Sequence, residues 1–135
     1  MPIAGFSFRK ISAERTEGTG TKINIENNVS VKNIEDIDIG LNKEGNKTLK
    51  FTFEFSAKFT PGFGEIILEG EVLYVGEEKK IKDILKEWKK DKKVNKDLFP
   101  EILNYLLTKS NVEAIILSKD VNLPSPVPLP KVNVK

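Results

Sequence analysis

The sequence lacks most of the side chains that carry out acid–base, nucleophilic and metal chemistry. Its 135 residues include no cysteine and no histidine. Disulfides, thiolate nucleophiles and cysteine-based zinc sites are therefore excluded, and the commonest general base near neutral pH is missing. Glu69 and Glu71 could share one strand face, but two carboxylates at that spacing are ordinary on a solvated surface. We expect no enzymatic activity, no bound metal and no cofactor.

A cluster of lysines is the first candidate for binding. Residues 79–96 contain nine lysines against three carboxylates, a local excess of +6 in a chain of net charge +2. Such a cluster could attract RNA or another polyanion, and the candidate patch consists of Lys89, Lys90, Lys92 and Lys93. The same lysines could simply keep a helix face solvated, because the chain has only two arginines and the cluster has no exposed aromatic residues between its lysines. Both alternatives stay open.

A row of phenylalanines is the second candidate. In residues 49–59 every odd position is apolar and every even position is polar or charged, which predicts a strand with one buried face. Phe51 and Phe55 most simply belong to the core. However, two helices are few to cover a sheet of four strands. We therefore expect surplus apolar surface to serve both self-association and a groove for other polypeptide chains.

The elements that must position these residues follow from the periodicity of the sequence. After Gly76 the apolar spacing changes from two residues to the three-and-four pattern of an amphipathic helix. Strands come first and helices follow, which predicts an α+β domain with helices on one face of an antiparallel sheet. The expected strands span about 5–15, with a change of phase typical of a bulge, 22–34, 48–59 and 65–75, and the expected helices span about 79–90 and 97–118.

Local signals mark the connections between these elements. TPGFG at 60–64 predicts a hairpin, and the polar stretch 35–47 predicts a loop with a short extended piece. Asp97 could cap the second helix, and Pro100 suits its first turn. Residues 110–118 fit either a continuation of this helix, which we prefer, or a short strand, since valine and isoleucine favour strands.

The stretch LPSPVPLP at 123–130 cannot continue a helix, because its prolines lack the N–H group. It could form a polyproline II ligand for an aromatic groove, or pack on its own domain through Leu123, Val127 and Leu129. We prefer an extended strap on the protein's own surface.

The chain is long enough for one domain with one core, since 39% of its residues are hydrophobic. We expect residues 1–135 to form this domain, with 123–135 as its extended C-terminal segment. The N-terminus does not read as a signal peptide, and no apolar stretch could span a bilayer. We therefore expect a cytoplasmic protein.

Five segments resemble the SecB family of export chaperones, and the order of the segments carries the resemblance. Family-like patterns are seen at Glu71-Val72, at Leu98-Phe99-Pro100 and at Asn122-Leu123-Pro124. The segments are GFSFRKISAER at 5–15, LKFTFEFSA at 49–57, ILEGEVLYVG at 67–76, LFPEILNYLL at 98–107 and NLPSPVPLPKV at 122–132.

The resemblance implies a four-stranded antiparallel sheet with two helices, assembled as a dimer of dimers that holds unfolded or pre-export polypeptides in hydrophobic grooves. Some relatives instead serve toxin–antitoxin systems. Glu71 matches the family glutamate that faces the SecA translocase, but the C-terminal residues are basic rather than acidic, which argues against handover to a SecA-type partner. The expected groove walls are Phe51, Phe55, Phe99, Leu123, Val127 and Leu129. Two competing hypotheses are an RNA- or ribosome-associated module that uses the lysine cluster and a purely structural assembly protein.

Overall fold

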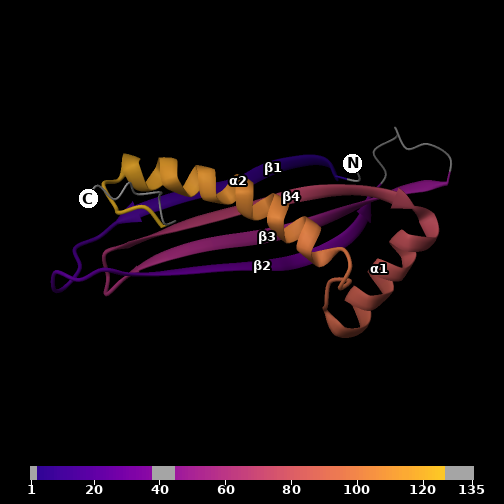
Figure 1. Cartoon of the computed structure of the whole chain (residues 1–135), viewed down its shortest axis with the longest axis horizontal. Helices are drawn as coiled ribbons and strands as arrows, with labels where there is room; N and C mark the ends of the chain where they lie inside the picture. The colour runs from indigo at the N-terminus through magenta and orange to yellow at the C-terminus, as the bar shows by residue number, and fades with distance from the viewer. Residues whose placement is uncertain (1–2, 38–44, 127–135) are drawn as a thin grey trace, which may run out of the picture.

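A computed structural model describes residues 3–37 and 45–126 of the chain. They form a four-stranded antiparallel sheet followed by two helices, which confirms the predicted α+β class (Figure 1). Every element begins and ends within three residues of its predicted bounds. The elements are β1 (Ile3–Arg15), β2 (Asn24–Ile37), β3 (Asn46–Thr60), β4 (Gly64–Glu77), α1 (Glu78–Asp91) and α2 (Phe99–Asp120).

Two local predictions are decided by these bounds. Residues 110–118 are helical, as preferred, because they continue the buried stripe of α2. The loop predicted over 35–47 is shorter than expected, since residues 35–37 belong to β2 and residues 46–47 to β3. The short extended piece expected within that loop falls mostly outside the described residues.

The strand order in the sheet is β1-β4-β3-β2, so β1 and β2 are its edges. The β3–β4 hairpin predicted from TPGFG lies at the centre, with Phe55 opposite Leu68 and Phe51 opposite Val72. The register of β1 shifts between Phe8 and Lys10, where the sequence changes phase. The register of β2 shifts between Val31 and Asn33, and this bulge kinks an edge strand.

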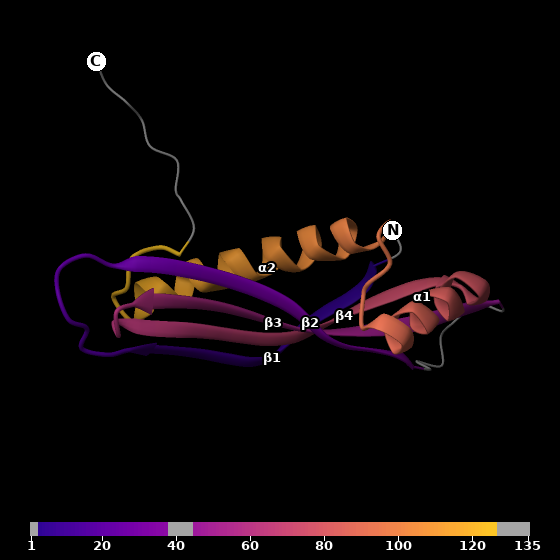
Figure 2. The ribbon, with the colours of Figure 1, turned by 90° about the horizontal axis from the view of Figure 1, so that it is seen from below.

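Both helices pack on the same face of the sheet, here called the inner face, which carries the odd-numbered residues 49–59. α2 runs along this face, while no described helix covers the opposite, outer face beneath it (Figure 2). The outer face carries the even-numbered polar residues of β3 together with residues such as Glu71 and Leu73 of β4. The leucine, valine and glutamate residues on this side of β4 are half-buried, which fits the mixed pattern in the sequence.

The phenylalanine row divides between two core clusters. Phe51 and Phe53 pack with Trp88 and the first half of α2. Phe55 and Phe59 pack instead under the second half of α2 and Leu123. The division has a simple cause, since 15 residues of β3 span about 50 Å whereas 14 residues of α1 span about 21 Å. One short helix cannot cover so long a sheet.

The start of α2 corrects one prediction. Asp97 makes no capping hydrogen bond, and the side-chain oxygen of Asn95 accepts the N–H groups of Asp97 at 2.9 Å and of Leu98 at 3.3 Å instead. Asn95 takes this role because a turn that begins there brings its carbonyl to the N–H of Phe99 at 2.8 Å. Pro100 occupies the first turn of the helix, as predicted.

The chain reverses direction after α2 and returns across the sheet. Asn122 has a left-handed backbone (φ 58°), and the N–H of Leu123 donates to the carbonyl of Ser118 at 2.7 Å. Leu123 is then buried in the second core cluster. The side-chain amide of Asn27 on β2 donates to the carbonyl of Pro126 at 2.8 Å. Residues 123–126 thus form a strap on the protein's own surface.

Candidate functional site

A cleft of about 340 Å³ opens where α1, the linker to α2, the start of α2 and the edge strand β2 meet. This volume lies at the small end of the range of ligand pockets, and it suits a side chain better than a folded partner. The lining residues come from four separate segments of the chain. They are Val31, Trp88, Lys92, Lys93, Val94 and Phe99.

The end of α1 sets the geometry of one wall. Lys92 adopts a left-handed conformation (φ 55°, ψ 35°), and its N–H donates to the carbonyl of Trp88 at 2.8 Å. The helix therefore stops, and the Lys92 side chain turns back so that its Nζ lies 5.4 Å from the centroid of the Trp88 ring. A cation at this distance is attracted to the ring face by roughly 0.5–1 kcal/mol at an exposed site.

Trp88 links the cleft to the core. Its side chain is 6% exposed and packs in the first core cluster. Its indole Nε1 is buried and has no hydrogen-bond partner among the described residues. A buried donor without an acceptor costs about 1–3 kcal/mol, so the cleft wall contains one unmet polar group.

Phe99 forms the opposite, apolar wall. It is 38% exposed at the first turn of α2, a position where a polar residue would be ordinary. Val94 and Val31 beside it are half-buried. None of the described residues that line the cleft is a carboxylate, so these residues make it apolar with two lysines at the rim.

The cleft lies beside a free strand edge. β2 has a neighbour on one side only, and Val31 points to the inner face opposite Phe53 just before the bulge. A free edge can pair with the backbone of an added extended segment, although a bulge and charged residues weaken such pairing. Val31 belongs both to this edge strand and to the cleft, so a segment paired with β2 at Val31 would lie beside the cleft.

The predicted groove residues do not lie together. Phe99 lines the cleft, whereas Phe51 and Phe55 are fully buried in different core clusters and present no surface to a groove. Leu123, the first residue of the strap, is buried in the second core cluster, away from the cleft residues of the first cluster. Val127 and Leu129 lie outside the described residues.

The predicted polyanion patch is divided as well. Lys92 and Lys93 belong to the cleft, while Lys89 and Lys90 line an open depression on α1 around Leu85. Sequence reasoning missed Val31, Trp88 and Val94 as site residues. The helical spacing of Trp88 predicted a core position, which the structure confirms. Nothing in the sequence indicates that the small exposed part of its ring also lines the cleft.

Glu71 lies on the outer face, away from the cleft. Lys50 bridges Glu71 at 3.2 Å and Glu35 at 2.7 Å, and Arg9 approaches Glu71 at 3.7 Å. Hydrogen bonds to Glu35 and then to Glu71 raise the pKa of the Lys50 ammonium above its ordinary value. The glutamate that the resemblance assigned to a partner is thus held by two cations of its own chain.

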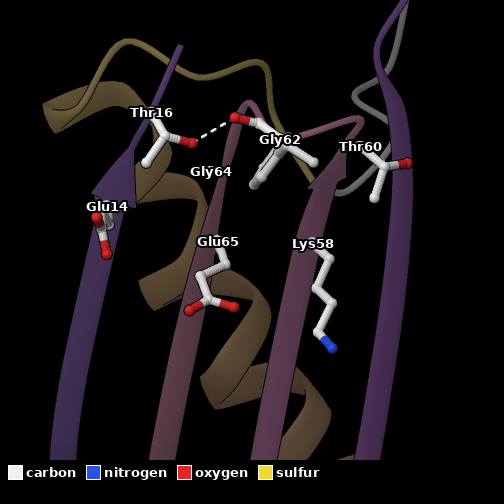
Figure 3. A pocket seen from close by; sticks show the side chains of 8 residues that line it. Glu14, Thr16, Lys58, Thr60, Gly62, Gly64 and Glu65 are labelled. Atoms are coloured by element: carbon white, nitrogen blue, oxygen red, sulfur yellow. Dashed lines mark hydrogen bonds between the residues drawn. The ribbon is translucent and has the colours of Figure 1, made fainter. Parts of the chain in front are cut away.

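A second depression, of about 280 Å³, lies on the outer face at the hairpin end of the sheet (Figure 3). Glu14, Glu65 and Lys58 follow one another across β1, β4 and β3, and the hydroxyl of Thr16 donates to the carbonyl of Gly62. Charged side chains on neighbouring strands are typical of a solvated sheet face. Across the described residues, no group of three side chains suited to hold a metal ion occurs. No helix in the same part of the chain is long and apolar enough to cross a membrane.

Comparisons with known proteins find a similarity of fold. No protein-family model matches the sequence, and no curated protein matches it. A solved structure of the SecB-like chaperone Rv1957 of Mycobacterium tuberculosis, in complex with a ChAD peptide from the antitoxin HigA1, is similar with a TM-score of 0.46 and 10% sequence identity. The similarity covers 98% of this chain and 91% of that one. A likeness of this degree concerns the fold and assigns no function to this chain.

Proposed function

We propose that the protein is a chaperone of the holdase type, which binds unfolded polypeptide segments in the cleft between α1, α2 and β2. The observation that carries this proposal is the half-exposed ring of Phe99 beside Trp88 at a free strand edge. An apolar side chain of a client would be buried against these rings. Each buried apolar side chain contributes about 1.5–3 kcal/mol, which is less than the ~4 kcal/mol of a millimolar complex, so one such contact does not hold a client by itself.

Backbone pairing gives the second part of the proposed mechanism. A client segment laid along β2 would use main-chain hydrogen bonds, which do not depend on its sequence, while the cleft selects one large side chain. Several such sites in one assembly would raise the overall affinity without any new contact. This mechanism requires neither a cofactor nor a chemical step. The clients we propose are pre-export polypeptides or, as in toxin–antitoxin systems, an antitoxin segment, met in the cytoplasm.

Self-association is a further part of the proposal. Val112 is 57% exposed and Ile116 48% exposed, one helical turn apart on the outward side of α2. An outward helix face is normally polar, and an apolar one is typical of a contact with another chain. We propose that a second copy of the chain covers this face in a homo-oligomer such as a dimer of dimers.

The test is suppression of client aggregation at a stoichiometric ratio. The wild-type protein should slow the aggregation of a chemically denatured client on dilution. Phe99→Ser should weaken this effect severalfold, whereas Ile11→Ser, an exposed apolar position on the opposite edge strand, should leave it unchanged. Failure of the wild-type protein to slow aggregation would refute the holdase proposal.

One observation favours a different candidate. Lys82, Lys86, Lys89 and Lys90 surround Leu85 on an open depression of α1 that carries no carboxylate. A polyanion such as RNA would fit this row. Its binding would weaken steeply with salt, as the release of counterions requires, and would vanish when the lysines are neutralised.

A further inference from the structure

The lysines at the rim of the cleft form no ion pair within the part of the chain that the structure describes. Lys92 and Lys93 make no ion pair with any residue that the structure describes, although Glu87 and Asp91 lie on the preceding turn of α1. Elsewhere on the surface, lysines do find carboxylates, as Lys82 does with Glu78 at 3.1 Å. Lys93 also lines a neighbouring depression that contains the carboxylates of Glu87, Asp91 and Asp97. Since neither Lys92 nor Lys93 forms an ion pair with a described residue, both ammonium groups can still meet a client carboxylate.

The indole N–H of Trp88 is a second polar feature of the cleft wall, separate from the lysines. Trp88 is more than nine-tenths buried, it lines the cleft, and its Nε1 lacks an acceptor. The ammonium of Lys92 lies over the same ring. An oxygen atom that enters beside Trp88 would meet a hydrogen-bond donor and a positive charge together.

We propose that the cleft selects client segments in which a large apolar side chain is followed by a carboxylate. This inference rests on the proposed holdase function and names the chemistry that the same site prefers. The apolar side chain lies against Phe99 and Val94, and the carboxylate binds Lys92 and Lys93. Because Nε1 of Trp88 is buried, a client oxygen accepts its N–H only after neighbouring side chains shift. Hydrogen bonds to charged groups are stronger than neutral ones, so they add selectivity to apolar burial.

A peptide fits these features better than a nucleic acid does. Single-stranded nucleic acids stack on exposed aromatic faces, whereas Trp88 exposes little surface and Phe99 projects from a different helix. The neighbouring edge of β2 offers backbone pairing, which a peptide can use and a nucleotide cannot. A segment of acidic and apolar residues also complements the local lysine excess.

The protein itself contains the probe for the test, because Trp88 is its single tryptophan. Its fluorescence emission is followed while each of two capped hexapeptides is titrated into the protein. The two peptides are identical except that one has Phe–Glu and the other Phe–Gln at its centre. Both should change the emission in a saturable way, and the Phe–Glu peptide should bind about tenfold more tightly, as one charge-assisted contact of about 1.4 kcal/mol implies. Equal affinities of the two peptides would overturn the proposal.

Two lysine pairs provide a matched control. Lys92→Gln with Lys93→Gln should abolish the preference for the Phe–Glu peptide, while Lys89→Gln with Lys90→Gln, the same change of charge one turn earlier, should keep it. If both double variants lose affinity equally and a single-stranded oligouridine competes with the peptide, residues 89–93 form a general surface for polyanions. The proposal would then be wrong. The variant Trp88→Phe should bind the Phe–Glu peptide severalfold more weakly, because an aromatic ring remains at this position while the N–H is lost. Its binding is measured by the fluorescence anisotropy of a labelled Phe–Glu peptide.

Aggregation assays on the same variants separate this inference from the holdase function. If the two peptides bind equally while the wild-type protein still suppresses aggregation, only the carboxylate preference fails. If neither peptide binds and aggregation is not suppressed, the proposed function fails with it. Circular dichroism of each variant shows that a loss of binding does not come from unfolding.

Discussion

Asn27 and Pro126 are joined by a hydrogen bond of 2.8 Å between the side-chain amide of the first and the carbonyl of the second. They are 99 positions apart in the sequence. Asn27 lies on the inner face of β2 opposite Ala57, next to the cluster in which Leu123 is buried. The bond therefore fixes the strap where α2 leaves the end of the long sheet uncovered.

Loss of this bond should destabilise the protein modestly. Asn27→Ala should lower the free energy of unfolding by about 0.5–1.5 kcal/mol, the usual contribution of one hydrogen bond. Asn28→Ala is the matched control, because its side chain points to the outer face of the same strand. Urea unfolding followed by circular dichroism measures both. Equal stabilities of the two variants would show that the strap contact contributes nothing.

The left-handed end of α1 makes a second prediction. At a φ of 55° an L side chain is strained, and glycine is not. Lys92→Gly and Lys92→Ala both remove the ammonium from Trp88, but only the alanine variant keeps the strain. We expect the glycine variant to be more stable than the alanine variant by about 1 kcal/mol in urea unfolding. The reverse order would mean that residue 92 is not left-handed in solution.

The ion pairs on the outer face predict a dependence on pH. Because Glu35 and Glu71 raise the pKa of Lys50 in the folded state, Lys50 binds its proton more tightly there than in the unfolded chain. This stabilisation is fully present below the ordinary pKa of 10.5 and is lost as pH rises through the folded value. Glu35→Gln should therefore lower the stability of the protein at neutral pH. Above the folded-state pKa of Lys50, the stability of the variant should approach that of the wild type.

The control for this prediction is Glu26→Gln. Glu26 lies on the same strand opposite Lys58 but makes no ion pair within the described residues. Thermal unfolding is recorded from neutral to alkaline pH. A pH profile of Glu35→Gln that matches the profile of Glu26→Gln would contradict a role for the bridge.

The apolar face of α2 predicts the result of a mass measurement. Val112→Lys with Ile116→Lys should divide the proposed oligomer at this contact and so lower its mass, because both side chains are about half exposed and would place charges in the contact. Size-exclusion chromatography with light scattering gives the mass. Ile11→Lys, exposed on β1, should leave the mass unchanged. A monomeric wild-type protein would refute the self-association proposal.

Short-range patterns in the sequence determine the elements of this fold. The strict alternation over residues 49–59 requires a strand with one buried face, and the structure buries all six odd positions. The change of spacing after Gly76 likewise specifies α1, since Ile81, Ile84 and Trp88 are its buried residues. The antiparallel pairing of β3 with β4 follows from the short connection between them.

Only the tertiary structure decided where a site could form. Composition made Phe51, Phe55 and Phe99 equal candidates, but the helices cover the first two and leave Phe99 half-exposed. The cleft joins Val31, Trp88 and Phe99 because β2 is an edge strand and a left-handed residue ends α1 beside it. Local periodicity reports which face of an element is apolar. It does not report whether the helices are long enough to cover the sheet. Where they are too short, some apolar side chains stay exposed.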